Sequence, residues 1–183
     1  MNEVLKTIKK RRSVRKYQDE QIKDEELDKI LESAIYAPNG SNTQSWHFTV
    51  IQNKDMINQI NDGAKEVMKE IDVPWIANMA RSDDFNIFHH APTVIIVSAK
   101  KDTLTPTEDC SAATQNMLLA AESMDIGSCW IGFAKFYFLK GENMKKFNIP
   151  EGNEVQFGVA LGYKVNENPK APTRNRNVFT YFR

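Results

Sequence analysis

A run of basic residues near the N-terminus offers the clearest chemistry in this sequence. Between positions 6 and 16 no acidic residue balances the cations, which are Lys6, Lys9, Lys10, Arg11, Arg12, Arg15 and Lys16. Arg11, Ser13 and Arg15 alternate, so in an extended segment their side chains share one face. Arginine forks and a serine hydroxyl are suitable donors for a phosphate group. The spacing is therefore compatible with a phosphate-binding segment.

Arg174 and Arg176 repeat the alternating spacing late in the sequence. Two other interpretations of these basic residues stay open at this point. In the first, each group of basic residues lies on a solvated surface, which is the commoner case for arginines taken alone. In the second, the N-terminal run binds nucleic acid. Nucleic acid is disfavoured because the run has no interleaved aromatic residues, and the chain balances 24 basic with 24 acidic residues.

Motifs for other chemistries are absent from the sequence. It contains no G-x-G-x-x-G after a strand, no P-loop, no G-x-S-x-G elbow and no H-E-x-x-H. The histidines are His47, His89 and His90, and their spacing predicts no metal site. Cys110 and Cys129 are too few for a disulfide framework. The apolar surroundings of Cys129 favour a buried, unreactive thiol over a nucleophile.

Composition is typical of a folded domain. The chain has 183 residues, a mass of 21.0 kDa, 41% hydrophobic residues and 26% charged residues, which is enough apolar material for a core. We expect one domain over residues 1–183. An apolar run such as Val94–Val97 is far shorter than the roughly 20 residues of a membrane-spanning helix, and the first residues lack a signal-like apolar segment. A cytoplasmic protein without a membrane partner is expected.

Hydrophobic periodicity predicts an α+β fold in which helices surround one sheet. Helices are expected at residues 2–10, from Asp24 to before Pro38, and at residues 55–70, 109–125 and 139–147. Asp24 is the expected N-cap of the second helix, and Gly127 is the expected stop of the fourth. Strands are expected at residues 46–52, 93–99, 128–132 and 155–163, the second of them buried on both faces. Residues 71–90 show no clear period.

Five segments resemble, in order, those of the nitroreductase family of FMN-dependent oxidoreductases. They are RRSVRKY, APNGSNTQSWHF, APTVIIV, DCSAATQNMLLAAESMDIGSCWIG and VQFGVALGYK. Together they cover most of the chain except about residues 60–90. The resemblance implies a nitroreductase-like fold with a central, mostly antiparallel sheet flanked by helices. It also implies an intertwined homodimer with FMN at the subunit interface.

The resemblance assigns the basic residues to the cofactor. It places Arg11 and Ser13 at the ribityl phosphate region of FMN and Arg15 near the pyrimidine edge of the flavin. Arg12 is included with this N-terminal group. The late basic pair is expected to clamp the phosphate and consists of Arg174 and Arg176.

Two further parts of the flavin site follow from the same resemblance. Main-chain N–H groups of Ile131 and Gly132 are expected to face flavin N5 and O4. A polar loop from the partner subunit is expected against the ring and the ribityl chain; its residues are Pro38, Asn39, Gly40, Ser41, Asn42 and Gln44.

The sequence departs from the family pattern in two places. Ser45 stands where the family has a proline before tryptophan, and we expect this change to loosen the loop. Residues 60–90 match poorly, in the region where family members usually cover the substrate. Trp75, Phe85 and Phe88 are candidates for lining the substrate pocket, and a place in the core is the commoner alternative for aromatic residues at such loose spacing.

The implied activity is transfer of electrons from NAD(P)H, through FMN, to a nitroaromatic compound, a quinone or a related acceptor in a ping-pong cycle. Flavin N5 carries the chemistry and no catalytic side chain is needed. Arg15 tunes the flavin, because reduction adds negative charge near N1 and O2. The alternatives are a flavin store or sensor without fast turnover, and a specialised member that performs dehalogenation or flavin breakdown.

Overall fold

Four antiparallel strands form one sheet in the computed structural model, which describes residues 1–167 and 169–183. Their order across the sheet is β1-β2-β4-β3. The strands are β1 (Trp46–Ile51), β2 (Thr93–Lys100), β3 (Ile126–Ile131) and β4 (Asn153–Tyr163). The long strand β4 pairs with β2 on one side and β3 on the other. The α+β fold and the antiparallel sheet expected from the sequence are confirmed.

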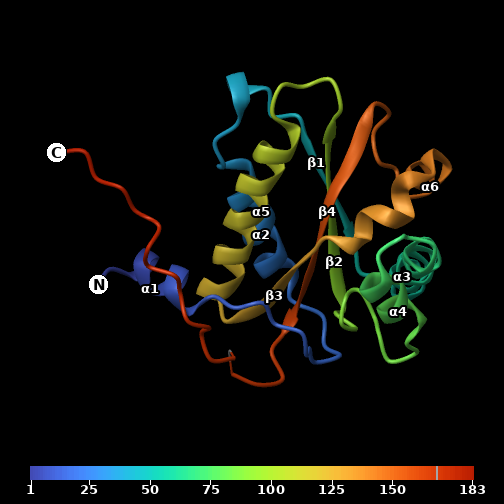
Figure 1. Ribbon diagram of the computed structural model, residues 1–183, viewed down its shortest axis with the longest axis horizontal. Coiled ribbons are helices and arrows are strands. Elements are labelled where there is room, and N and C mark those ends of the chain that lie inside the picture. The colour runs from blue at the N-terminus through green and yellow to red at the C-terminus, as the bar shows by residue number, and fades with distance from the viewer. Residues whose placement is uncertain (168) are drawn as a thin grey trace.

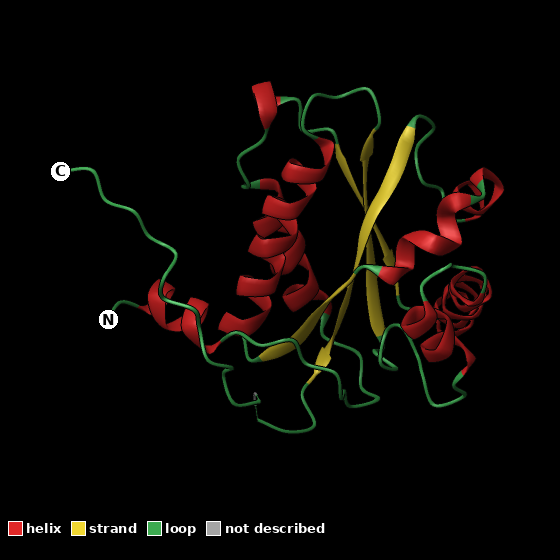
Figure 2. Ribbon diagram, in the orientation of Figure 1, coloured by secondary structure: helices red, strands yellow, loops and turns green. Residues whose placement is uncertain are grey.

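Helices cover both faces of the sheet (Figures 1 and 2). On one face lie α2 (Asp24–Ile35) and α5 (Pro106–Ser123); on the other lie α3 (Lys54–Lys69), α4 (Pro74–Arg81), the 3-10 helix η2 (Phe133–Leu139) and α6 (Gly141–Lys146). The short helix α1 (Glu3–Lys10) sits beside the lower end of α5, and the 3-10 turn η1 (Gly40–Asn42) precedes β1.

Strand β2 is buried on both faces because it contributes to two cores. Ile95 and Val97 pack in the core beneath α2 and α5, whereas Val94 and Ile96 pack in the core beneath α3 and η2. This alternation follows from the two-residue period of a strand. It explains why β2 has a continuous apolar sequence rather than an alternating one.

Several expected boundaries need correction. Lys23, not Asp24, is the N-cap of α2, and its N–H donates to the Glu26 carboxylate at 3.1 Å. Helix α5 ends at Ser123, before Gly127, because Asp125 turns the chain in the left-handed region with φ 60°.

The expected helix 139–147 is also shorter than predicted. Lys140 has an extended backbone, which separates η2 from α6. The segment without a clear period contains α4, which begins with Pro74 at its first turn. No helix within the described residues has the length and apolar character needed to cross a bilayer.

Gly127 is instead a point of close approach inside β3. A Cβ at this position would lie 2.9 Å from Val14 Cγ1 and 3.1 Å from the Gly162 carbonyl oxygen. The missing side chain lets residues 13 and 14 reach the edge of the sheet. Glycine is therefore required at position 127 because residues 13 and 14 of the same chain pack against it, and not because of its own backbone angles.

We expect Gly127→Ala to destabilise the fold by about 1–3 kcal/mol, because the new methyl group overpacks the contact with Val14. Thermal and urea unfolding measure the change. The matched control is Gly141→Ala, at the start of α6, where a Cβ meets no atom within 4 Å. That control gains helix propensity and should be neutral or stabilising by up to ~1 kcal/mol. Equal stability of the two variants would contradict the packing argument.

Candidate cofactor-binding site

The basic segment that follows α1 lies along the outer side of β3. Ser13 forms a parallel bridge with Ser128, and the Val14 N–H donates to the Ser128 carbonyl at 2.9 Å. Because the pairing is parallel, the basic segment and β3 run in the same direction, toward Gly132. Val14 is buried, so its neighbours Ser13 and Arg15 project to the opposite side.

A cavity of about 400 Å³ opens beside this segment. The start of the C-terminal tail forms its other wall, so the lining residues are Ser13, Val14, Arg15, Lys16, Asn166, Glu167 and Pro169. Arg12 takes a different role, because its guanidinium donates to the carbonyls of Lys9 at 2.8 Å and Arg11 at 2.6 Å. The structure thus brings Ser13, predicted for the phosphate region, and Arg15, predicted for the flavin edge, to one cavity that Arg11 does not line. It turns Arg12 toward the end of α1.

The charge of Arg15 acts on two groups that the sequence did not associate with it. Burial lowers the pKa of His89, and the Arg15 cation lowers it further. Burial raises the pKa of the Cys129 thiol, although Arg15 and Ser13 oppose that shift. His89 is distant from this segment in sequence, and no pattern in the sequence pointed to its position.

The end of β3 offers an open backbone flank. Ile131 is buried and pairs with Gly158 of β4. A Cβ on Gly132 would meet no atom within 4 Å. A flat ligand can therefore approach the main chain of Gly132 without displacing protein atoms.

Aromatic side chains gather immediately after Gly132. Phe133 stacks on Phe136 with ring centroids 6.2 Å apart, and it contacts Phe85 at 6.3 Å and Trp75 at 6.4 Å. Of the three aromatic candidates named from the sequence, Phe88 is fully buried in the core and Trp75 is 61% exposed. Phe85 is partly buried and packs against the core. The structure thus places Phe88 in the core, Phe85 at its margin and Trp75 at the surface.

The polar loop Pro38–Gln44 lies at the opposite end of α5 from the basic segment (Figure 1). Gly40 N–H donates to Asp109, in the first turn of α5, whereas Lys10 of α1 pairs with Asp125, just beyond its last turn. Helix α5 has 18 residues, which is about 27 Å at 1.5 Å per residue. One chain therefore does not bring the two predicted halves of the site together.

Ser45, at the end of this loop, is more tightly held than the sequence suggested. Its side chain is buried, and its hydroxyl lies 3.4 Å from that of Thr103. Its carbonyl accepts a hydrogen bond from the Lys100 N–H at 3.3 Å. These contacts hold Ser45 against the end of β2 and the segment that follows it.

Arg174 and Arg176 lie on an exposed C-terminal tail that passes α1 and extends away from the sheet (Figure 1). The Arg174 guanidinium donates to the Pro172 carbonyl at 3.3 Å, a contact within the tail. Apolar side chains follow on the same tail and are 62–96% exposed; they are Val178, Phe179, Tyr181 and Phe182. The tail thus presents both cations and unburied apolar surface.

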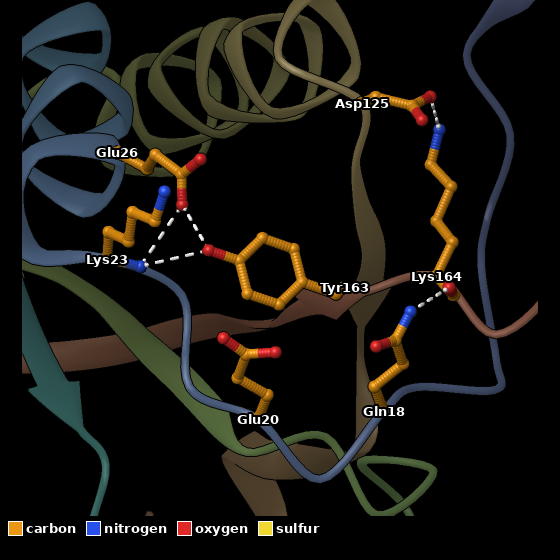
Figure 3. A pocket seen from close by; sticks show the side chains of 7 residues that line it. All are labelled: Gln18, Glu20, Lys23, Glu26, Asp125, Tyr163 and Lys164. Atoms are coloured by element: carbon orange, nitrogen blue, oxygen red, sulfur yellow. Dashed lines mark hydrogen bonds and ion pairs between the residues drawn. The ribbon is translucent and has the colours of Figure 1, made fainter.

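A second, polar cavity of about 380 Å³ lies between the start of α2 and the end of β4. Its side chains pair with one another (Figure 3): the Tyr163 hydroxyl donates to Glu26 at 2.6 Å, and Lys164 contacts Asp125 at 3.0 Å. The hydrogen bond from Tyr163 holds the pKa of Glu26 below its usual value. These contacts tie β4 to α2 and α5, so they stabilise the fold at this cavity.

A sheet between two helical layers, with a basic segment paired to its edge strand β3, defines an α+β protein with a basic edge. Comparison with known proteins makes the class specific. The family model described as "Nitroreductase family" matches residues 8–163, and the chain belongs to this family.

The chain is similar to a protein of Archaeoglobus fulgidus whose name places it among NADH dehydrogenases/NAD(P)H nitroreductases. The two are 34% identical, over 91% of this chain and 88% of that protein. It is also similar to a crystal structure of a nitroreductase with bound FMN from Bacteroides fragilis, with 35% identity, complete coverage of both chains and a TM-score of 0.93. A nitroreductase with bound FMN from Desulfitobacterium hafniense gives 29% identity, complete coverage of both chains and a TM-score of 0.91.

Both thiols are expected to resist modification in the native protein. Cys110 and Cys129 are buried, and burial, aided by the charge of Asp109, raises the pKa of Cys110 to about 12. Near pH 8 each is therefore a protonated, inaccessible thiol. An aromatic disulfide reagent should react with them only after denaturation. Ser123→Cys, on the exposed end of α5, is the control and should react at once. Rapid native reaction of Cys129 would contradict the closed packing beneath Arg15.

Proposed function

We propose that this protein binds FMN and passes electrons from NAD(P)H to small acceptors of the nitroaromatic or quinone class. The observation that carries the proposal is the direction of the basic segment along β3. It begins at Arg11, next to α1, and leads toward the open flank of Gly132. Ser128 and Ile131 are three residues apart, which is about 10 Å along a strand. This separation suits a phosphate at one end and a flavin ring at the other.

The donor chemistry of the segment fits FMN. Arg11 and Ser13 supply charged and neutral donors for the phosphate and ribityl end. Arg15 holds a fixed positive charge nearer the ring, where it favours the added negative charge of the reduced cofactor. Main-chain N–H groups of Ile131 and Gly132 orient the ring. When bound, FMN supplies the hydride chemistry itself, which is why no catalytic side chain is assigned.

We further propose that the active form is a homodimer in which each loop Pro38–Gln44 completes the partner's site. Two α5 helices packed antiparallel about a two-fold axis place the start of each helix beside the end of the other. Within one chain the polar loop and the basic segment lie about 27 Å apart along α5. In the proposed dimer the loop of one chain lies beside the basic segment of the other.

Unburied apolar groups on several elements support this assembly. Val4, Leu5 and Ile8 of α1 are 48–65% exposed, and Leu119 of α5 is partly exposed. The tail adds its own exposed aromatic residues. Arg174 and Arg176 lie on the same tail, and we assign them to the phosphate of FMN. In an isologous interface both subunits contribute the same patch, so these apolar groups would be buried on each of the two chains.

The first test is the absorption spectrum of the purified protein, recorded without oxygen before and after addition of NADH and then NADPH. We expect a flavin band that bleaches within seconds with at least one donor. A band that persists with both donors would instead favour a flavin store or sensor. A protein that stays colourless even after incubation with FMN would overturn the proposal.

The dimer is tested by Leu119→Arg, which places a charge on the partly exposed face of α5. We expect a monomer by light scattering and a loss of FMN affinity of at least about tenfold, because each site loses the partner's loop. Lys54→Glu, on the exposed start of α3, is the control and should remain a dimer with normal affinity. Full FMN affinity in a monomeric Leu119→Arg protein would refute the shared site.

A further inference from the structure

Asp109 is a buried acid that joins the polar loop to the N-cap residue of α5. Its side chain lies in the first turn of α5, and the residue is only 4% exposed. Oδ1 accepts the Gly40 N–H at 3.0 Å and the Thr105 hydroxyl at 3.0 Å. Oδ2 is buried without a hydrogen-bond partner within the described residues. A carboxylate placed in this way is costly, so its contribution to folding stability alone gives little reason for it.

The loop that Asp109 holds has an unusual backbone. Ser41 and Asn42 each have φ of 53°, and Gln44 has φ of 45°, a left-handed conformation that costs free energy for residues other than glycine. The Gln44 N–H donates to the Asn39 side chain at 2.9 Å and closes the turn. A strained segment of this kind persists only where other contacts fix it.

Gly40 is the point at which the loop is fixed to α5. A Cβ here would lie 2.2 Å from Thr105 Oγ1, so the loop backbone approaches the helix as closely as glycine allows. The side chains of Ser41, Asn42 and Gln44 remain exposed. The contact at Gly40 therefore fixes the loop backbone on the side of α5, while the three polar side chains on the other side face solvent.

We propose that Asp109 is a positioning residue for the cofactor site of the partner subunit. By holding Gly40, it keeps the strained loop in the conformation that contacts FMN bound by the other chain. This inference rests on the proposed function. The inference adds to the proposed site a residue that does not touch the cofactor. It predicts that a change at Asp109 in one subunit lowers the FMN affinity of the site on the other subunit.

The experiment measures the FMN dissociation constant and the visible circular dichroism of bound FMN for Asp109→Ala and Asp109→Asn. Removing the acceptor leaves the Gly40 N–H unpaired, so we expect Asp109→Ala to weaken FMN binding about tenfold or more and to change the flavin dichroism. Asp109→Asn keeps an oxygen acceptor and should stay within about threefold of the parent protein. Ile149→Ala, in the core near α6, is the control for lost stability with normal affinity.

Mixed dimers separate positioning from a general structural role. One subunit carries Asp109→Ala and the other carries Arg11→Ala, with different affinity tags for purification. One site then combines an intact basic segment with an intact loop, and the other site lacks both. We expect half the normal amount of FMN to bind with the parent affinity.

Two results would overturn the positioning role while leaving FMN binding and electron transfer in place; the second would also refute the loop shared between subunits. They are parent-like affinity and dichroism in Asp109→Ala, and mixed dimers without any high-affinity site. If the parent protein itself binds no FMN, the proposed function fails and the positioning role fails with it.

Discussion

Helix α5 imposes the constraint on which the rest of the structure depends, because buried acids fix both of its ends. Asp109 holds the polar loop at the first turn. Glu122, whose side chain is only 2% exposed, pairs with Lys10 at 3.4 Å and Lys164 at 3.2 Å at the last turn. A helix of this length is stiff, so the two attachments set the distance between loop and basic segment. Breaking a buried pair such as Glu122–Lys164 by removing one partner typically costs about 3–5 kcal/mol. At the other end the loop is held by hydrogen bonds to Asp109.

The same constraint bears on the proposed dimer. There each protomer would need to hold only two half-sites at fixed positions, and the two-fold axis would supply the missing half of each site. A flexible α5 would misalign the two halves. The buried Glu122–Lys164 pair thus fixes one end of α5 at some cost in desolvation.

The sequence pattern located most helices and strands because each has a regular apolar face, as in α2, or a continuous apolar run, as in β2. It failed where the structure depends on single backbone angles or distant contacts. The left-handed turn at Asp125 and the extended backbone at Lys140 are of the first kind. The positions of His89 and Cys129 around Arg15 are of the second kind, since only the assembled sheet brings these segments together.

The basic segment also covers β3, which would otherwise be an open edge of the sheet. Its parallel bridge at Ser13 occupies backbone groups on that edge, and such covering protects a sheet against unwanted strand pairing. The alternation that buries Val14 against Gly127 is the same alternation that turns Ser13 and Arg15 outward. Edge protection and ligand presentation are therefore one structural feature. A residue change that loosens the edge would also move Ser13 and Arg15, which ties the stability of β3 to the geometry of the proposed site.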